Sequence, residues 1–207
     1  MLEARQYAPA TERNRQPILA VLQQVLPPAG SVLEIASGTG EHATFFAPRL
    51  PHLRWIPTER EATSRASIQA WQTALPSDNL QPPLALDVSQ TPWPVEANQP
   101  TATPITAIVN INMVHISPWE MCEHLMSGAE RILPTGGVLY LYGPFDQVQV
   151  PMAPSNEAFD RMLRDRNPEW GIRQLEAVCA IAQKHSLQHS QTIPMPANNL
   201  SVIFHRQ

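Results

Sequence analysis

The chain has 207 residues, 43% of them hydrophobic and 15% charged, which is enough apolar material for one continuous core and too much for a disordered chain. Its 14 lysines and arginines and 18 aspartates and glutamates give a formal net charge of -4, so no global positive field is available to hold a phosphate backbone. We therefore expect a single domain over residues 1–207 and no nucleic acid among its partners.

The cysteines and the distribution of apolar residues bear on compartment and metal binding. Cys122 and Cys179 are too few for a disulfide framework, and neither they nor the seven histidines show the spacing of metal ligands. Residues 1–11 lack the basic and apolar regions of a signal peptide, and no apolar run reaches the ~18 residues of a membrane span. These patterns predict a cytoplasmic protein with no metal and no membrane association, and they leave the oligomeric state open.

Hydrophobic periodicity between proline-rich breaks predicts an alternation of helices and strands. Helices are expected over residues 13–26, 41–50, 61–75, 118–133, 156–166 and 173–185. Strands are expected over residues 31–36, 53–56, 83–88, 105–111, 137–142, 187–193 and 200–205. Before the fourth helix, Ser117 is expected as the cap, Pro118 as the first helical residue and Glu120 as the partner in a capping box.

The order of these elements indicates the fold class. Five strands separated by helices imply a parallel sheet with right-handed crossovers. The last two strands flank a Pro-Met-Pro-Ala-Asn-Asn turn and form an antiparallel hairpin at one edge. The sequence therefore predicts an α/β, Rossmann-like fold in three layers, with a seven-stranded and mostly parallel sheet. Residues 1–30 would form an N-terminal helix or lid on a core of residues 31–207.

The densest functional signal is a strand that runs into small residues and then opens a helix, over residues 32–42 (VLEIASGTGEH). Gly38 and Gly40 in this turn would let the backbone approach a ligand closely, and the following helix offers unpaired N–H groups. A tight strand-to-helix turn without a ligand is the alternative interpretation.

Two acidic residues strengthen the case for a ligand. Glu59 follows Gly40 by about 20 residues, the distance at which the carboxylate of a second strand reaches a ribose diol. Asp87 lies at the end of the third expected strand. Because ligands of open α/β sheets bind beyond the carboxyl ends of the strands, three such positions in order indicate one adenosyl-type cofactor. Each acid taken singly could instead be a solvated loop residue.

The turn resembles the first motif of class I S-adenosylmethionine-dependent methyltransferases, which has the form acidic-x-G-x-G-x-G. Glu34 stands at the acidic position, Ala36 replaces the first glycine, and Gly38 and Gly40 match the other two. The resemblance implies the class I methyltransferase fold and S-adenosyl-L-methionine as cofactor. A nicotinamide dehydrogenase is disfavoured because G-x-G-x-x-G is absent from this turn.

The resemblance also assigns roles to these residues. Glu34 would hold the methionine amino group, the two glycines would pack against the cofactor, Glu59 would bind the ribose hydroxyls and Asp87 would face the adenine amino group. The complete expected cofactor site is Glu34, Ala36, Gly38, Gly40, Glu59, Asp87, Val88 and Asn110.

Further segments extend the resemblance along nearly the whole chain. They are residues 13–14 (RN), 36–42 (ASGTGEH), 112–119 (NMVHISPW), 142–145 (YGPF), 155–156 (SN), 170–173 (WGIR) and 195–199 (MPANN). Together they resemble the methyltransferase-like 26 family, which is also catalogued as a domain of unknown function. The resemblance implies a methyltransferase and names no substrate.

Catalysis of methyl transfer requires mainly alignment of the acceptor with the methyl group, and in some cases removal of a proton. His115, just after the fourth expected strand, is the candidate general base, since an imidazole titrates near neutral pH. Alternatively, His115 packs and hydrogen-bonds locally in the loop before the next helix. Residues expected to contact the acceptor are Arg13, Asn14, Asn112, Tyr142, Asn198 and Asn199.

Three functions compete. The first is a methyltransferase that uses S-adenosylmethionine on an unknown, small-molecule acceptor. The second is a non-catalytic sensor or scaffold that binds S-adenosylmethionine or S-adenosylhomocysteine. The third, a nucleic-acid methyltransferase, is disfavoured because residues 110–113 (NINM) lack the Pro-Pro-aromatic pattern of the amino-methylating enzymes and because the chain is acidic.

Overall fold

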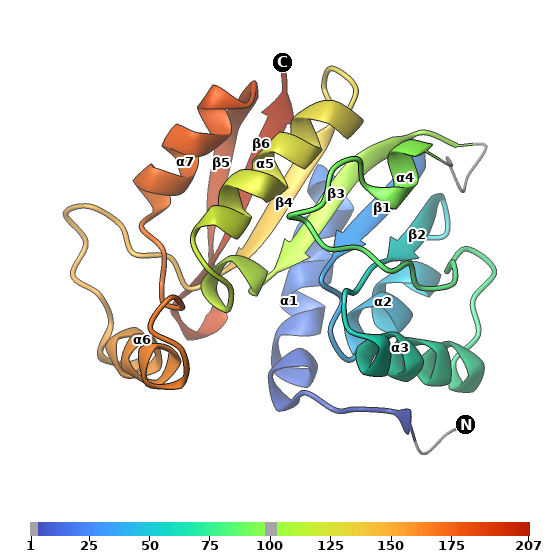
Figure 1. The fold of residues 1–207 in the computed structure, drawn as a ribbon, viewed down its shortest axis with the longest axis horizontal. Coiled ribbons are helices and arrows are strands. Elements are labelled where there is room, and N and C mark those ends of the chain that lie inside the picture. Colours follow the sequence, from blue (N-terminus) through green and yellow to red (C-terminus); the bar gives the residue numbers. More distant parts are fainter. Residues whose placement is uncertain (1–3, 98–102) are drawn as a thin grey trace.

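A six-stranded mixed sheet organises this computed structural model, which describes residues 4–97 and 103–207 (Figure 1). The strands are β1 (Gly30–Ile35), β2 (Leu53–Pro57), β3 (Ile105–Ile111), β4 (Val138–Gly143), β5 (Leu187–Met195) and β6 (Asn199–Arg206). The helices are α1 (Pro9–Val25), α2 (Glu41–Phe46), α3 (Ala62–Ala74), α4 (Pro94–Ala97), α5 (Glu120–Ile132), α6 (Pro154–Arg166) and α7 (Leu175–Lys184). Short 3-10 turns are η2 (Ala47–Arg49), η3 (Met113–His115) and η4 (Pro196–Asn198).

The strand order β2-β1-β3-β4-β6-β5 confirms a mostly parallel sheet with an antiparallel hairpin at its carboxyl-terminal end. Strands β2, β1, β3 and β4 pair in parallel, whereas β6 runs antiparallel to β4 and to β5. The carboxyl ends of the four parallel strands therefore meet at one edge of the sheet. The helices α3 and α6 lie toward that edge (Figure 1).

The expected seventh strand, over residues 83–88, is absent, and this part of the prediction was wrong. The chain beside β2 forms only isolated bridges, one between Leu80 and Trp55 and one, within this segment, between Leu84 and Thr58 just beyond β2. Pro82 and Pro83 have no N–H to donate, so a continuous ladder cannot form there. The N–H of Leu84 still donates to the carbonyl of Pro57 at 3.0 Å, and this bond keeps the following Asp87 beside the end of β2.

Two apolar cores, one on each face of the sheet, make the three layers. Successive residues of a strand point to opposite faces, so Val32 and Leu33 of β1 belong to different cores. One core is completed by side chains from α4, α5 and α7, and the other by side chains from α1, α2 and η2. Both central faces are thus covered, which explains why the central strands are almost continuously apolar.

Among the helix starts that differ from those predicted are those of α1 and α5. Helix α1 begins at Pro9, four residues before the expected start, and it contains Pro17. The capping box before α5 is wrong, because the helix begins at Glu120 and its cap residue, Trp119, makes no side-chain cap hydrogen bond. The hydroxyl of Ser117 donates instead to the carbonyl of Met113 at 2.8 Å. The hydroxyl of Ser117 is therefore bonded to η3, and no side-chain oxygen of the described residues accepts an N–H of the first turn of α5 as a cap would.

Both cysteines are free, and Cys122 is buried within α5. Among the described residues, no helix combines the length and apolar character needed to cross a bilayer. The described part of the chain also contains no group of three or more histidine, cysteine, aspartate or glutamate side chains that could hold a metal ion.

Asn79 joins the segment after α3 to the start of β2, and its replacement tests this connection. Its Nδ2 donates to the carbonyls of Ala47, Leu50 and Leu53 at 2.7, 3.1 and 2.8 Å. Removing a donor that several carbonyls share costs about 1–3 kcal/mol. We expect N79A to lower the free energy of unfolding by that amount and N79D to lower it further, because a carboxylate would face three carbonyl oxygens. Urea unfolding measures both, with D78A as the control for the same turn. An N79D variant as stable as the parent protein would contradict this connection.

Candidate functional site

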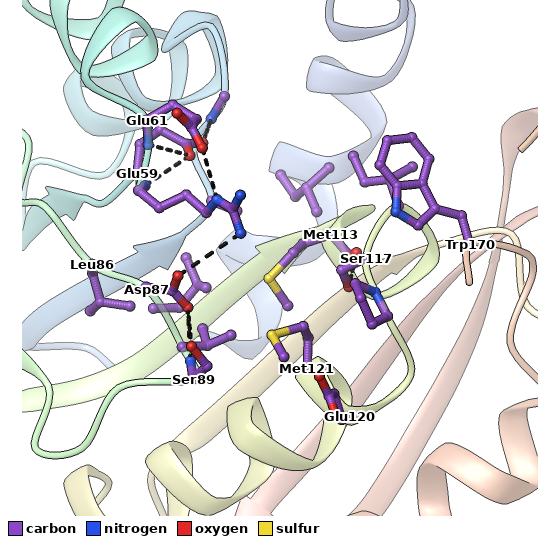
Figure 2. A pocket seen from close by; sticks show the side chains of 18 of the residues that line it. Glu59, Glu61, Leu86, Asp87, Ser89, Met113, Ser117, Glu120, Met121 and Trp170 are labelled. Atoms are coloured by element: carbon purple, nitrogen blue, oxygen red, sulfur yellow. Dashed lines mark hydrogen bonds and ion pairs between the residues drawn. The ribbon is translucent and has the colours of Figure 1, made fainter. Parts of the chain in front are cut away.

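A cavity of about 630 Å³ opens at the edge where the parallel strands end (Figure 2). It lies between the loops that follow β1, β2 and β3 and the first turn of α5. Of the eight residues that the sequence assigned to a cofactor, five lie on its wall: Ala36, Gly38, Glu59, Asp87 and Val88. The other lining residues are Ile35, Arg60, Glu61, Leu86, Ser89, Ile111, Met113, Ile116, Ser117, Pro118, Glu120, Met121, Asn167 and Trp170.

The two glycines of the turn after β1 have different roles. Gly38 lines the cavity with a φ of +56°, and a Cβ placed on it would meet no protein atom within 4 Å. Gly40, with a φ of +91°, does not line the cavity, and a Cβ there would come within 2.8 Å of the Cα of Ile68. The structure therefore places open space beside Gly38 and the close approach of α3 beside Gly40.

The carboxylate of Glu59 is held against the glycine turn. Its Oε2 accepts the N–H of Gly38 at 3.1 Å, and its Oε1 accepts the N–H of Arg60 at 2.8 Å. This contact joins the loop after β2 to the loop after β1. The two segments that the sequence assigned to a single cofactor are thus in direct contact on one wall.

Asp87 lies on the same wall and is held by its own turn. Its Oδ1 accepts the N–H and the hydroxyl of Ser89 at 3.0 and 2.7 Å, and its Oδ2 lies 3.9 Å from a guanidinium nitrogen of Arg60. Partial burial raises the pKa of Asp87, but the hydrogen bonds from Ser89 and the charge of Arg60 outweigh it, and the pKa is lowered overall. Asp87 is therefore ionised at neutral pH.

Glu34 lies beneath the glycine turn and not on the cavity wall. Its side chain is 2% exposed, and its Oε2 accepts the indole N–H of Trp55 at 2.7 Å. Burial raises the pKa of Glu34 to about 7, against the hydrogen bonds from Trp55 and Ser37, and the negative charge of Glu59 adds to the increase. The backbone carbonyl of Glu34 accepts the N–H of Thr58 at 2.9 Å. Glu34 thus supports the turn from within the protein.

Asn110 and Asn112, at the end of β3, also lie off the wall of this cavity. Asn110 is fully buried, and its Nδ2 donates to the carbonyl of Ile35 at 3.0 Å. Its Oδ1 has no hydrogen-bond partner among the described residues. Asn112 adopts a left-handed conformation with a φ of 65°, and its N–H donates to the carbonyl of Tyr142.

His115 is buried behind the wall. Its Nδ1 accepts the N–H of Arg173 at 3.3 Å, and its ring packs edge-on against Phe145 at 4.7 Å between centroids. Burial, with the nearby charge of Arg173, lowers the pKa of His115 to about 3. Such an imidazole is neutral at pH 7 and a poor proton acceptor. The geometry agrees with local packing, the alternative that the sequence left open, and the role of general base stays a prediction without geometric support.

The six residues expected to contact an acceptor are not brought to one site, although Asn14 and Asn112 both lie beside Tyr142. Asn14 of α1 bonds the ring of His42 through its Oδ1 at 2.8 Å and also interacts with the buried phenol of Tyr142. Arg13 is exposed on α1. Asn198 and Asn199 line a second cavity, of about 240 Å³, at the turn between β5 and β6. None of these residues, nor Asn112, lies on the wall of the larger cavity.

The residues that sequence analysis missed are those on the wall opposite Asp87. Trp170 and Asn167 come from the loop after α6, and Ser117 and Pro118 come from the loop before α5. Arg173 ties the two loops together, because its guanidinium donates to the carbonyls of Val114, Ser117 and Glu169 at 2.9, 2.6 and 2.8 Å. The segments 112–119 and 170–173, already singled out by their resemblance, were the signal that could have identified this wall.

The N-terminal segment does not cover the cavity in the part that the structure describes, from residue 4 onward. The N–H of Ala8 donates to Oε2 of Glu41 at 2.6 Å, and the N–H of Gln6 donates to the hydroxyl of Ser67 at 2.8 Å. Ser67 in turn donates to the carbonyl of Thr39, at 2.7 Å. The segment thus braces the glycine turn from outside. Residues 1–3 of the expected lid lie outside the described residues.

A family model described as "Protein of unknown function (DUF938)" matches residues 5–206. The chain belongs to the DUF938 family. This match confirms the expected membership of a family of unknown function and does not extend to the narrower name methyltransferase-like 26.

Solved structures that resemble this DUF938 protein in fold include methyltransferases. An O-methyltransferase family protein from Burkholderia thailandensis superposes with a TM-score of 0.77 at 13% identity, over 96% of this chain and 57% of that one. Human N-acetylserotonin methyltransferase, in complex with S-adenosylmethionine, gives 0.75 at 10%, over 95% and 52%. CalO1, a methyltransferase in calicheamicin biosynthesis bound to S-adenosylhomocysteine, gives 0.72 at 12%, over 94% and 54%. The chain thus spans little more than half the length of these proteins, and the likeness shows an α/β Rossmann-like methyltransferase fold.

The burial of Glu34 predicts a pH dependence of stability. The folded pKa is raised from 4.5 to about 7, so the folded state holds the proton more tightly than the unfolded state. The resulting stabilisation is complete below pH 4.5 and is lost as the pH rises through 7, with a size on the order of 3 kcal/mol. We expect E34Q to lose this component, so that its free energy of unfolding falls less than that of the parent protein between pH 5 and 8.

Chemical unfolding at several pH values measures the difference between the two proteins. E157Q, at an exposed position on α6, is the control for removal of one carboxylate. Parallel pH profiles for the parent protein and E34Q would contradict the assignment.

Proposed function

We propose that this DUF938 protein is an S-adenosylmethionine-dependent methyltransferase that acts on a small-molecule acceptor in the cytoplasm. The proposal includes the narrower membership of the methyltransferase-like 26 family. The single observation that carries it is the wall formed by Gly38, Glu59 and Asp87, which come from three successive segments of the chain and line one cavity. The net charge of -4 supports a small molecule over a nucleic acid as the partner.

The residues on this wall suit an adenosyl cofactor. The open space beside Gly38 allows the ligand to approach the backbone of the turn, and the carboxylate of Glu59 is an acceptor for the ribose hydroxyls. Leu86 and Val88 give the apolar surfaces that a purine ring packs against. When bound, the cofactor would supply a methyl group made electrophilic by a positively charged sulfur.

The protein's own contribution would be alignment. Holding the acceptor and the methyl donor in one cavity converts an encounter of two molecules into a reaction within a complex. The loops around Ser117 and Trp170, fastened by Arg173, form the side of the cavity that an acceptor would contact. They would position the acceptor and reduce its exposure to water.

A second candidate function, a non-catalytic binder of the same cofactor, is favoured by the position of His115. The only imidazole offered as a base lies behind the wall with a pKa lowered to about 3 by burial. Formation of S-adenosylhomocysteine in the presence of metabolite extracts supports the enzyme, and binding without any turnover supports the sensor or scaffold.

Asp87 provides the first binding test. Removing one buried polar partner of a ligand costs about 1–3 kcal/mol, or roughly 5- to 150-fold in affinity. We expect D87A to weaken the binding of S-adenosylhomocysteine by a factor in this range, measured by titration calorimetry. The exposed Asp165 on α6 supplies the control D165A, which should bind as the parent protein does. Unchanged affinity in folded D87A would remove Asp87 from the site.

Gly38 provides the second test. A valine there would place a branched side chain in the open space and would strain a backbone with a φ of +56°. We expect G38V to abolish detectable binding of S-adenosylhomocysteine. The control is G136V, because Gly136 also has a positive φ, +81°, and open space around it but lies in the turn before β4. A folded G38V protein with normal affinity would show that the turn only connects β1 to α2.

A further inference from the structure

The larger cavity has two walls of different character (Figure 2). Glu59, Leu86 and Asp87 lie on one side, and Met113, Met121, Ser117 and Trp170 lie on the other. Since the first wall is the one assigned to the cofactor, the second is the surface left for an acceptor. The inference that follows rests on the proposed function and concerns this second wall.

Apolar side chains line much of the second wall, beside the polar Ser117, Asn167 and Glu120. The indole of Trp170, the ring of Pro118 and the side chain of Ile116 line it, and Ile116 is 43% exposed in spite of its apolar character. A planar ring would cover these surfaces and gain the free energy of apolar burial. Because Arg173 fixes the loops that carry them, the wall is formed before a ligand arrives, and little ordering opposes binding.

The charges around the cavity select against one class of acceptor. Of the described residues on its wall, Glu59, Glu61, Asp87 and Glu120 carry carboxylates, and Arg60 alone carries a cation. The Nε of Arg60 is already 2.9 Å from a carboxylate oxygen of Glu61. The surplus of negative charge disfavours an anionic acceptor and favours positive charge that develops on the acceptor during the reaction.

The wall also lacks a good base. Among the described residues that line the cavity, there is no histidine, lysine, cysteine or tyrosine. His115 and Tyr142 are buried elsewhere. A hydroxyl acceptor must lose its proton as the new bond forms, and carboxylates as a class are weak bases. A pyridine-type ring nitrogen carries a lone pair and no proton, so it needs no base.

We propose that the acceptor is a planar, uncharged nitrogen heterocycle and that the methyl group is transferred to its ring nitrogen. The lone pair of the nitrogen forms the bond to the methyl carbon, and the carbon–sulfur bond breaks with its electron pair going to sulfur. The positive charge passes from sulfur to the ring nitrogen, and no proton moves. Glu120 and Trp170 line the wall where this cation forms and stabilise it through their carboxylate and aromatic ring.

Binding of three matched ring compounds tests the charge preference. The protein saturated with S-adenosylhomocysteine is titrated with 1-methylquinolinium, which resembles a methylated product, with quinoline and with 1-naphthoate. We expect the cation to bind at least tenfold more tightly than the anion, and quinoline to bind between them. Equal or tighter binding of 1-naphthoate, or no binding of any of the three, would overturn the proposal.

Two variants locate the preference on the second wall. We expect W170L to weaken the binding of 1-methylquinolinium by about 3- to 20-fold and that of quinoline by less, because leucine keeps apolar contact and removes the aromatic ring. E120Q should weaken the cation by about two- to fivefold, whereas E123Q, on the same helix but off the wall, should not. Loss of cation binding in E123Q but not in E120Q or W170L would place the site elsewhere.

Turnover tests the reacting atom. The protein is incubated with S-adenosylmethionine and either quinoline or 1-naphthol at concentrations that saturate the site, and the products are identified by mass. N-methylated product without O-methylated product supports the proposal; O-methylation of 1-naphthol alone, or no conversion of bound quinoline, overturns it. Calorimetry with S-adenosylhomocysteine alone separates the two levels. If S-adenosylhomocysteine binds and the ring compounds do not, only this inference is lost. If S-adenosylhomocysteine does not bind, the proposed function itself is lost.

Discussion

The hydrogen bonds of Glu34 at the end of β1 determine the geometry of the candidate site. Its carboxyl group accepts the indole N–H of Trp55 in β2, and its backbone carbonyl accepts the N–H and the hydroxyl of Thr58 just beyond β2. These bonds hold the ends of two neighbouring strands together. Glu59, the next residue after Thr58, can therefore reach the N–H of Gly38. Burial of Glu34 beneath the turn raises its pKa, but its hydrogen bonds hold the turn in one position.

Hydrogen bonds also hold the opposite wall together, between the loops before α5 and after α6, which are distant in the sequence. Arg173 donates to backbone carbonyls of the loop before α5 and of the loop after α6. The carbonyl of His115 also accepts the N–H of Gly171, at 2.9 Å. The buried imidazole of His115 fills the space between these loops and Phe145. Its place in the structure is thus explained by the loop geometry, with no need for it to exchange protons. The contacts on this side involve backbone atoms, so the side chains that face the cavity are left to determine selectivity.

The sequence predicted most of the order of elements, and it predicted that Gly38, Glu59 and Asp87 lie together at the carboxyl ends of the strands, because both follow from local patterns. Apolar periodicity defined the strands, and the position of Glu59 after its strand placed that residue at the same edge as Gly38. Apolar periodicity alone did not show that Pro82 and Pro83 reduce the expected third strand to isolated bridges, although the prolines themselves, which lack an N–H, are a local signal against a continuous ladder. Local patterns could not distinguish Gly38 from Gly40, because the difference depends on Ile68 in a separate helix. His115 was chosen by its place in the chain, and its burial depends on segments more than fifty residues away.

The two walls together relate charge to chemistry. A sulfonium compound is positively charged before the transfer, and a methylated ring nitrogen is positively charged after it, so the carboxylates around the cavity meet a cation throughout the reaction. A hydroxyl acceptor would instead release a proton and end as a neutral ether, so the acceptor itself would carry no positive charge after the transfer. A surplus of carboxylates on a cavity with an aromatic face therefore matches a reaction that moves a positive charge across the cavity more closely than one that discharges it.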